Sequence, residues 1–166
     1  MAKKVVLAFS GGLDTSYCAL YLKQRGYDVV TVTVDTGGLG DKARAIETRA
    51  VELGALRHYN IDARKDVYGQ VIQYLIKLNG LYEGQYPVMC ADRYVIVQKM
   101  LQVAGKEKAS AVAHGCTAMG NDQVRFDAAL KHLAPGMTII TPVRDMCLKR
   151  EEEIAYLKKH GFDVEV

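Results

Sequence analysis

The sequence lacks the features that mark membrane-bound and secreted proteins. No apolar run approaches the roughly 20 residues that a membrane span requires. The first residues, Met-Ala-Lys-Lys, lead into a short apolar run without a long hydrophobic region or a cleavage-like site. The four cysteines, at positions 18, 90, 116 and 147, form no C-x-x-C pair, a spacing that does not suit zinc. Dispersed thiols are typical of a reduced compartment. We therefore expect a cytoplasmic protein with no membrane partner.

The sequence also has no large excess of positive or negative charge. The formal net charge is +3, from 22 Lys and Arg against 19 Asp and Glu, and basic residues gather only in pairs such as Lys3-Lys4. A nucleic-acid surface needs a denser basic cluster, so we expect no nucleic-acid partner. Repeats, low-complexity tracts and linkers are absent as well. Since 166 residues are an ordinary length for one domain, the sequence predicts a single domain over residues 1–166.

The chain does contain a regular alternation of strand and helix patterns. Apolar or β-branched runs typical of buried strands lie at residues 4–9, 28–35, 56–61, 111–114 and 138–141. Helical patterns follow them, at residues 15–24, 41–53, 63–78, 92–108, 121–133 and 148–160. Residues 79–86 are interpreted as a loop. Such alternation predicts an α/β, Rossmann-like fold: a doubly wound, parallel, five-stranded sheet with helices on both faces.

The segment S-G-G-L-D-T-S, residues 10–16, separates the first predicted strand from the first helix. In a parallel sheet, ligands bind beyond the carboxyl ends of the strands. The two glycines let backbone N–H groups turn toward one point, and the helix N-terminus adds a positive partial charge. The hydroxyls of Ser10, Thr15 and Ser16 add donors. The segment therefore predicts a phosphate-binding loop; the alternatives are a tight turn and simple helix capping.

This loop differs from two well-known phosphate motifs. It has no lysine and no G-x-x-x-x-G-K-[ST], which excludes a Walker loop, and no G-x-G-x-x-G, which disfavours a dinucleotide fold. S-G-G-L-D-T-S instead resembles the pyrophosphate loop of the ATP pyrophosphatase superfamily, whose members split ATP between the α- and β-phosphates. That resemblance implies an adenine nucleotide alpha hydrolase-like fold.

A second polar stretch, A-H-G-C-T-A-M-G-N-D-Q-V-R-F-D, covers residues 113–127 and joins a short strand to a helix. Its hydroxyl, amide, carboxylate and guanidinium groups gather where an amino-acid substrate could be held by its amine and carboxylate. The alternatives are that Asn121 or Asp122 caps the helix and that Arg125 pairs with Asp122. His114 is a candidate proton carrier or a hydrogen-bonded residue at the end of a strand.

Five motifs together resemble the argininosuccinate synthase family: A-F-S-G-G-L-D-T-S, V-D-T-G-G, E-G-x-Y-P, A-H-G-C-T-x-x-G-N-D-Q-V-R-F and I-T-P-V-R-D. The resemblance covers essentially the whole chain. It implies a ligase that condenses citrulline with aspartate, using ATP and Mg²⁺, and releases AMP and pyrophosphate. Citrulline would first be adenylated, and the amine of aspartate would then displace AMP. No activated side-chain nucleophile is needed, since holding the reactants in line supplies much of the rate.

The resemblance also implies roles for matching positions. The ATP positions are Ala8, Phe9, Ser10, Gly11, Gly12, Leu13, Asp14, Thr15, Ser16, Val34 and Gly115. The citrulline positions are Tyr86, Asn121 and Arg125, and the aspartate positions are Thr117, Asn121 and Asp122. Asp14 is also a candidate ligand of Mg²⁺, with capping of its own helix as the alternative.

Several residues depart from the family pattern. Ala91 stands where a serine is usual and Tyr94 where an arginine is usual; the other departures are Gly38, Met89, Cys90, Ala118 and Met119. Full-length members continue into a synthetase domain and form homotetramers. We therefore expect this chain to be the nucleotide-binding portion, inactive by itself. The alternatives are another adenylating enzyme, such as a tRNA sulfurtransferase, and a non-catalytic nucleotide-binding module.

Overall fold

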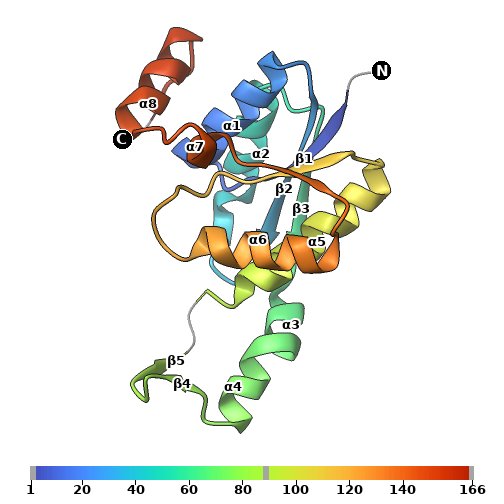
Figure 1. Ribbon diagram of the computed structural model, residues 1–166, viewed down its shortest axis with the longest axis vertical. Helices are drawn as coiled ribbons and strands as arrows, with labels where there is room; N and C mark the ends of the chain where they lie inside the picture. Colours follow the sequence, from blue (N-terminus) through green and yellow to red (C-terminus); the bar gives the residue numbers. More distant parts are fainter. Residues whose placement is uncertain (1–2, 88–89, 165–166) are drawn as a thin grey trace.

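Strands and helices alternate along the chain in the computed structural model, which describes residues 3–87 and 90–164 (Figure 1). The strands are β1 (Lys4–Ala8), β2 (Asp28–Asp35), β3 (Arg57–Asp62), β4 (Leu81–Tyr82), β5 (Tyr86–Pro87), β6 (Ala111–Ala113) and β7 (Thr138–Ile140). The helices are α1 (Leu13–Gln24), α2 (Ala43–Glu52), α3 (Arg64–Val67), α4 (Gln73–Lys77), α5 (Asp92–Glu107), α6 (Asp122–Leu133), α7 (Pro142–Asp145) and α8 (Arg150–Lys159), with the 3-10 turn η1 (Gly40–Lys42) and the π-helical turn η2 (Tyr68–Ile72). Within the described ranges, no helix combines the length and apolar character needed to cross a membrane.

The main sheet is parallel and has the strand order β3-β2-β1-β6-β7. Val5 of β1 pairs with Val29 of β2 on one side and with Ala111 of β6 on the other. The chain builds outward from β1 through β2 to β3, then returns to the other side of β1 for β6 and β7. This reversal leaves a crevice beyond the carboxyl ends of β1 and β6. The predicted doubly wound, parallel, five-stranded fold is confirmed.

Helices cover both faces of this sheet because successive residues of a strand point to opposite sides. Val5 and Leu7 belong to the core that β1 shares with α1, α2 and α8, whereas Val6 belongs to the core shared with α5 and α6. Figure 1 shows α1 above and α6 below β1. Strands that are buried on both faces read as continuous apolar runs, which explains why residues 4–9 could be recognised from the sequence.

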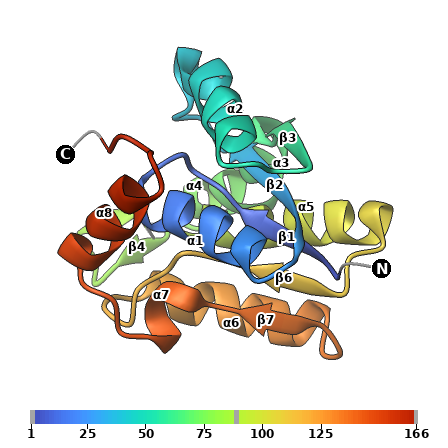
Figure 2. The same ribbon diagram turned by 90° about the horizontal axis from the view of Figure 1, so that it is seen from above.

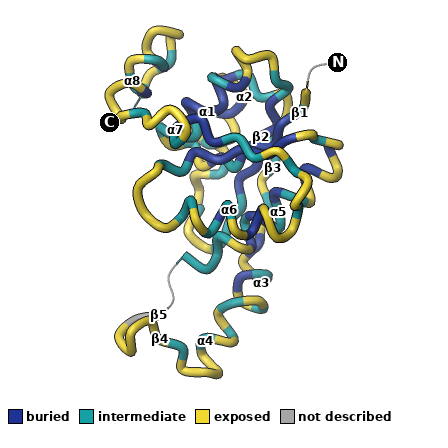
Figure 3. The backbone as a smooth tube through the Cα atoms, viewed as in Figure 1, coloured by how far each residue is buried: buried dark blue, intermediate teal, exposed yellow. Residues whose placement is uncertain are grey.

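One segment was predicted less well. Residues 63–78 were expected to form one helix, but the helix is interrupted by the π-helical turn η2 between α3 and α4. The expected loop at 79–86 contains a small antiparallel hairpin, in which Leu81 pairs with Pro87 and Tyr82 with Tyr86. Two-residue strands are too short to show an alternating pattern. Residues 64–87, here called the arm, extend away from the sheet (Figure 1), and residues 64–85 are largely exposed (Figure 3).

A buried carboxylate at the carboxyl end of α5 links the amino ends of β1 and β3, at the edge of the sheet opposite to the crevice. Glu107, at the end of α5, accepts hydrogen bonds from Lys4 Nζ at 2.8 Å, Arg57 at 2.7 Å and Tyr59 Oη at 2.6 Å. The bonds from Lys4 and Tyr59 lower the pKa of Glu107 to about 2. The charged groups at the amino edge of the sheet are therefore paired with one another. The carboxyl edge is the edge at which a ligand is expected to bind.

The core on the α5–α6 side can be tested by a matched pair of methionine substitutions. Met100 is fully buried, whereas Met119 is 85% exposed. We expect Met100→Ala to lower the free energy of unfolding by about 2–5 kcal/mol, because it leaves a cavity. Met119→Ala is the control and should change it by less than about 0.5 kcal/mol. Urea unfolding followed by circular dichroism measures both, and equal effects would contradict this description of the core.

Candidate functional site

A cleft of about 820 Å³ lies at the carboxyl edge of the sheet, between the segments that follow β1, β2 and β6. The predicted site residues that line it are Ala8, Phe9, Ser10, Gly12, Leu13, Asp14, Thr15, Val34, Gly115, Thr117 and Asp122. Residues from distant parts of the sequence thus share one cavity, in the crevice between the segments that follow β1 and β6. Gly11, Ser16, Asn121 and Arg125 do not line it.

The phosphate loop is ordered by its own hydroxyl groups. Gly11 has φ +77°, in the left-handed region that favours glycine. Ser10 Oγ accepts the N–H of Gly12 at 3.3 Å, and Thr15 Oγ1 donates to the carbonyl of Gly12 at 3.2 Å. Ser16, which is buried, donates through Oγ to the carbonyl of Gly11 at 3.4 Å. The loop is therefore shaped before any ligand arrives.

Helix α1 begins at Leu13, within this loop segment, and directs its first turn at the cleft. Gly12 is the N-cap residue, so no side chain caps the helix in the usual way. The N–H groups of the first turn have no acceptor within the helix, and the helix dipole adds a positive partial charge there. Such a terminus suits an anion. The simple-capping alternative is not observed, because no side chain forms a capping hydrogen bond at the start of α1.

The loop after β6 lies against this first turn. An ideal Cβ on Gly115 would lie 3.1 Å from the carbonyl carbon of Asp14 and 3.2 Å from the backbone nitrogen of Thr15. Both neighbours are backbone atoms, which move little. Glycine at position 115 is therefore what allows the two halves of the crevice to touch.

His114 precedes this glycine and is hydrogen-bonded through both ring nitrogens. The ring is 1% exposed. Its Nδ1 accepts the N–H of Cys116 at 3.3 Å, so its Nε2 carries the proton and donates to Asp127 Oδ1 at 3.1 Å. Burial lowers the pKa of His114, which keeps the ring neutral at pH 7. Of the two predictions for this residue, these bonds favour a positioning role over a proton carrier.

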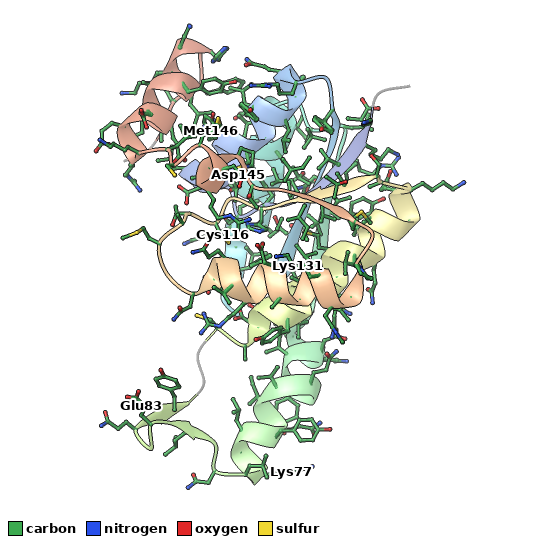
Figure 4. All side chains as sticks on the ribbon, viewed as in Figure 1. Lys77, Glu83, Cys116, Lys131, Asp145 and Met146 are labelled. Atoms are coloured by element: carbon green, nitrogen blue, oxygen red, sulfur yellow. The ribbon has the colours of Figure 1, made fainter. Side chains whose placement is uncertain are left out.

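The hydrogen bonds continue from Asp127 to α7. Arg144 donates to Asp127 Oδ2 at 2.9 Å and to Thr141 Oγ1 at 3.0 Å, and Thr141 donates to Asp145 at 2.6 Å. Although burial acts in the other direction, the bonds from His114 and Arg144 lower the pKa of Asp127. Figure 4 labels Cys116 and Asp145 at the two ends of this network. The β6 loop, α6 and α7 are thereby joined into one unit.

The predicted amino-acid positions are only partly gathered. Asp122 lines the cleft and is held by two guanidinium groups, from Arg93 at 3.0 Å and Arg125 at 3.3 Å. The second contact is the Asp122–Arg125 ion pair, which the sequence analysis gave as the alternative to substrate binding by Arg125. Tyr86 lies on β5 in the arm, far along the chain from α6. Of the departures from the family pattern, Met89 falls outside the described residues.

Two arginines that sequence analysis missed also line the cleft: Arg93, in the first turn of α5, and Arg150, the first residue of α8. Neither belongs to a local phosphate motif. They reach the cleft only because α5 and α8 begin at its rim, and the sequence contains no signal that could have identified them.

A buried acidic side chain lies behind the phosphate loop. Glu153 of α8 is 2% exposed, and its Oε2 has no hydrogen-bond partner among the described residues. Burial, and then the neighbouring carboxylate of Asp14, raise the pKa of Glu153 to about 7. The side chain is thus largely protonated below neutral pH, where it places no second negative charge beside Asp14.

The contact at Gly115 yields a direct test. We expect Gly115→Ala to destabilise the protein by about 1–3 kcal/mol, because the added methyl group presses on the backbone of α1. Gly136→Ala is the matched control, since nothing lies within 4 Å of its Cβ. Urea unfolding of both variants gives the comparison; equal stability would show that the β6 loop does not pack on α1 in this way.

The raised pKa of Glu153 predicts a dependence of stability on pH. Below the ordinary glutamate value of 4.5, the carboxyl is protonated in both the folded and the unfolded chain. As the pH rises toward 7, the unfolded chain releases this proton first, so the folded state loses stability. Relative to Glu153→Gln, the protein should lose about 1–3 kcal/mol between pH 4.5 and 7.5. Urea unfolding at both pH values measures this, and a constant difference between the two proteins would contradict it.

Comparison with known proteins agrees with this geometry. Residues 4–163 match the family described as the arginosuccinate synthase N-terminal HUP domain. The chain is 45% identical over 165 residues to argininosuccinate synthase of Bacillus licheniformis, and 50% identical over 165 residues to that of Saccharolobus solfataricus. These matches cover 99% and 98% of the chain, but only 41% and 42% of the relatives. The chain thus spans about two fifths of their length.

Solved structures show the same fold at low sequence identity. A predicted subunit of tRNA methyltransferase from Methanocaldococcus jannaschii is similar with a TM-score of 0.61 and 19% identity, over 95% of this chain and 76% of that one. A 4-thiouridine synthetase in complex with RNA and ATP is similar with a TM-score of 0.59 and 16% identity, over 96% of this chain and 41% of that one. Fold, cleft and sequence matches lead to one conclusion: the chain belongs to the argininosuccinate synthase family, as its N-terminal HUP domain.

Proposed function

We propose that this chain binds ATP in the cleft at the carboxyl edge of its sheet, as the nucleotide-binding part of a ligase that joins citrulline to aspartate. The observation that carries the proposal is the preshaped loop at residues 10–16, which opens into the free N–H groups of α1. The argininosuccinate synthase matches support the choice of reaction. The tRNA-related structural neighbours are below 20% identity and support the fold alone.

The nucleotide would lie across the crevice, with its triphosphate at the end of β1 and its base toward the end of β2. Its triphosphate would meet Ser10, Gly12 and the first turn of α1, which supply N–H and hydroxyl donors. Its base would lie toward Val34, at the end of β2, and Gly115 would let its middle approach the backbone closely. Donors that are already aligned stabilise charge as it develops on the leaving pyrophosphate, without the cost of reorganisation.

Magnesium ions fit this arrangement. Mg²⁺ is commonly bound by one or two carboxylates together with substrate phosphates, and Asp14 is the carboxylate that borders the phosphate loop in the cleft. Within the described residues, no group of three or more metal-binding side chains forms a dedicated site. Mg²⁺ bound with ATP would neutralise phosphate charge, and the Asp14 carboxylate would hold one side of its coordination shell.

The amino acids would bind on the β6–α6 side. We assign aspartate to Thr117, Asn121 and Asp122, and citrulline to Tyr86, Asn121 and Arg125, from their match to the family motif. The ureido oxygen of citrulline would attack the α-phosphate of ATP and displace pyrophosphate, and the aspartate amine would then displace AMP. The His114–Asp127–Arg144 network supports this side, because it ties the backbone of the segment after β6 to helix α6.

The sequence and the family resemblance also bear on binding partners, cellular location and oligomeric state. We propose small-molecule rather than nucleic-acid partners, since the net charge is only +3 and no basic cluster is present in the sequence. We also propose a cytoplasmic location, from the dispersed cysteines, and a homotetramer for the longer relatives, from the family resemblance.

The loop assignment predicts the behaviour of one glycine variant. Gly12 has φ −75° and ψ 178°, and its Cβ would meet only Ser10 Oγ, at 3.4 Å. Gly12→Val should therefore fold normally but fill the space that the phosphates need. We expect the unchanged chain to bind ATP–Mg²⁺ with a Kd of about 0.1–1 mM, or about −4 to −5.5 kcal/mol, and the variant to show no measurable binding.

Titration of amide chemical shifts measures both dissociation constants in this range. Gly136→Val is the control, because that glycine lies outside the cleft in open space. Normal ATP affinity in a folded Gly12→Val protein would disprove the loop assignment. Failure of the unchanged chain to bind ATP would disprove the proposed function itself.

A further inference from the structure

The first turn of α8 lies beside the phosphate loop, although the two are about 135 residues apart in sequence. Helix α8 packs along α1 in both views (Figures 1 and 2). The rings of Tyr17 and Tyr156 lie 4.8 Å apart between these helices, and Tyr156 hydrogen-bonds Gln24. This packing brings the start of α8 to the rim of the cleft, where Arg150 becomes part of its lining.

The cleft has few positively charged side chains, and they differ in whether they form ion pairs. Arg93 and Arg150 are its only Lys or Arg side chains among the residues that the structure describes. The guanidinium of Arg93 is occupied by Asp92 at 2.8 Å and by Asp122 at 3.0 Å. For Arg150, the described part of the chain contains no ion pair and no side-chain hydrogen bond. The phosphate loop itself has no lysine. Arg150 is thus the uncommitted cation of this cavity.

The nearby acidic groups show where this cation acts. Glu153, one turn along α8, faces Asp14, Tyr17 and Cys18 of α1. Arg150 acts on the carboxyl of Glu153 in the direction that lowers its pKa, but burial and Asp14 outweigh this effect. Arg150 therefore acts electrostatically on Glu153 and lines the same cleft as Asp14, yet no carboxylate of the described residues forms an ion pair with it.

We infer that Arg150 is a phosphate-binding residue, whose guanidinium contacts the β- and γ-phosphates of ATP from the wall of the cleft formed by α8. The inference rests on the proposed binding of ATP. A planar guanidinium can donate two parallel hydrogen bonds to phosphate oxygens. The loop and the α1 terminus supply donors from one side, and Arg150 supplies a full charge that the loop lacks. The same group then stabilises the pyrophosphate as it leaves.

A comparison of nucleotides tests this assignment. In Arg150→Gln, the Kd for ATP–Mg²⁺ should rise about ten- to a hundredfold, the usual effect of losing a hydrogen bond to a charged group. The Kd for AMP, which lacks the two outer phosphates, should change less than about twofold. Arg150→Lys should fall between, because lysine keeps the charge but not the planar fork. Amide chemical-shift titration of the 166-residue chain gives each value.

Lys158→Gln is the matched control, since Lys158 is an exposed cation on the same helix outside the cleft. It should leave both affinities unchanged. Equal ATP affinity in Arg150→Gln and the unchanged chain would overturn the inference while leaving the proposed function intact. Equal losses for ATP and AMP, or a lowered melting temperature, would assign Arg150 a structural role and also overturn it. An unchanged chain that binds no ATP would defeat both proposals.

Discussion

The close contact between Gly115 and the first turn of α1 is the constraint on which the site depends. The parallel sheet reverses its order at β1, so the segments after β1 and β6 leave toward opposite faces and would otherwise diverge. With no Cβ at position 115, the backbone after β6 reaches the backbone of Asp14 and Thr15. The phosphate loop and the segment leading to α6 therefore share one cleft, and every further feature of the site is arranged around that contact.

Hydrogen bonds and ion pairs make the two edges of the sheet different. At the amino edge, Glu107 takes up the charges of Lys4 and Arg57, so that edge is closed. At the carboxyl edge, the neutral ring of His114 ties the backbone of the β6 loop to Asp127 and so to α6. The polar groups of the phosphate loop, by contrast, bond mainly to one another. That leaves the helix N-terminus open to a ligand, which is the arrangement that anion binding requires.

Helix α8 adds a second layer of electrostatics behind and beside the loop. Its first turn contributes Arg150 to the cleft and the buried Glu153 to the region of Asp14. Below neutral pH, the largely protonated carboxyl of Glu153 avoids the repulsion that a second carboxylate beside Asp14 would cause between α8 and α1. The packing of α8 on α1 and the charge of the cleft are thus coupled. A chain of this family that lacked this helix would keep its loop and lose one wall of the cleft.

The order along the chain of the strands in the main sheet, the fold class and the family could be predicted from the sequence, and so could the place of the loop at residues 10–16, because each rests on neighbouring residues. Continuous apolar runs mark strands buried on both faces, and S-G-G-L-D-T-S is a contiguous motif at the end of one of them. The hairpin at Leu81–Tyr82 and Tyr86–Pro87 and the π-helical turn η2 are too short or too irregular to leave such a pattern. Only the tertiary structure decided that Arg150 and Glu153 lie beside Asp14 and that His114 is bonded on both nitrogens. These contacts join residues from separate elements. The sequence shows that a charged residue begins a helix, but only the packing of that helix places the charge at the edge of a cavity.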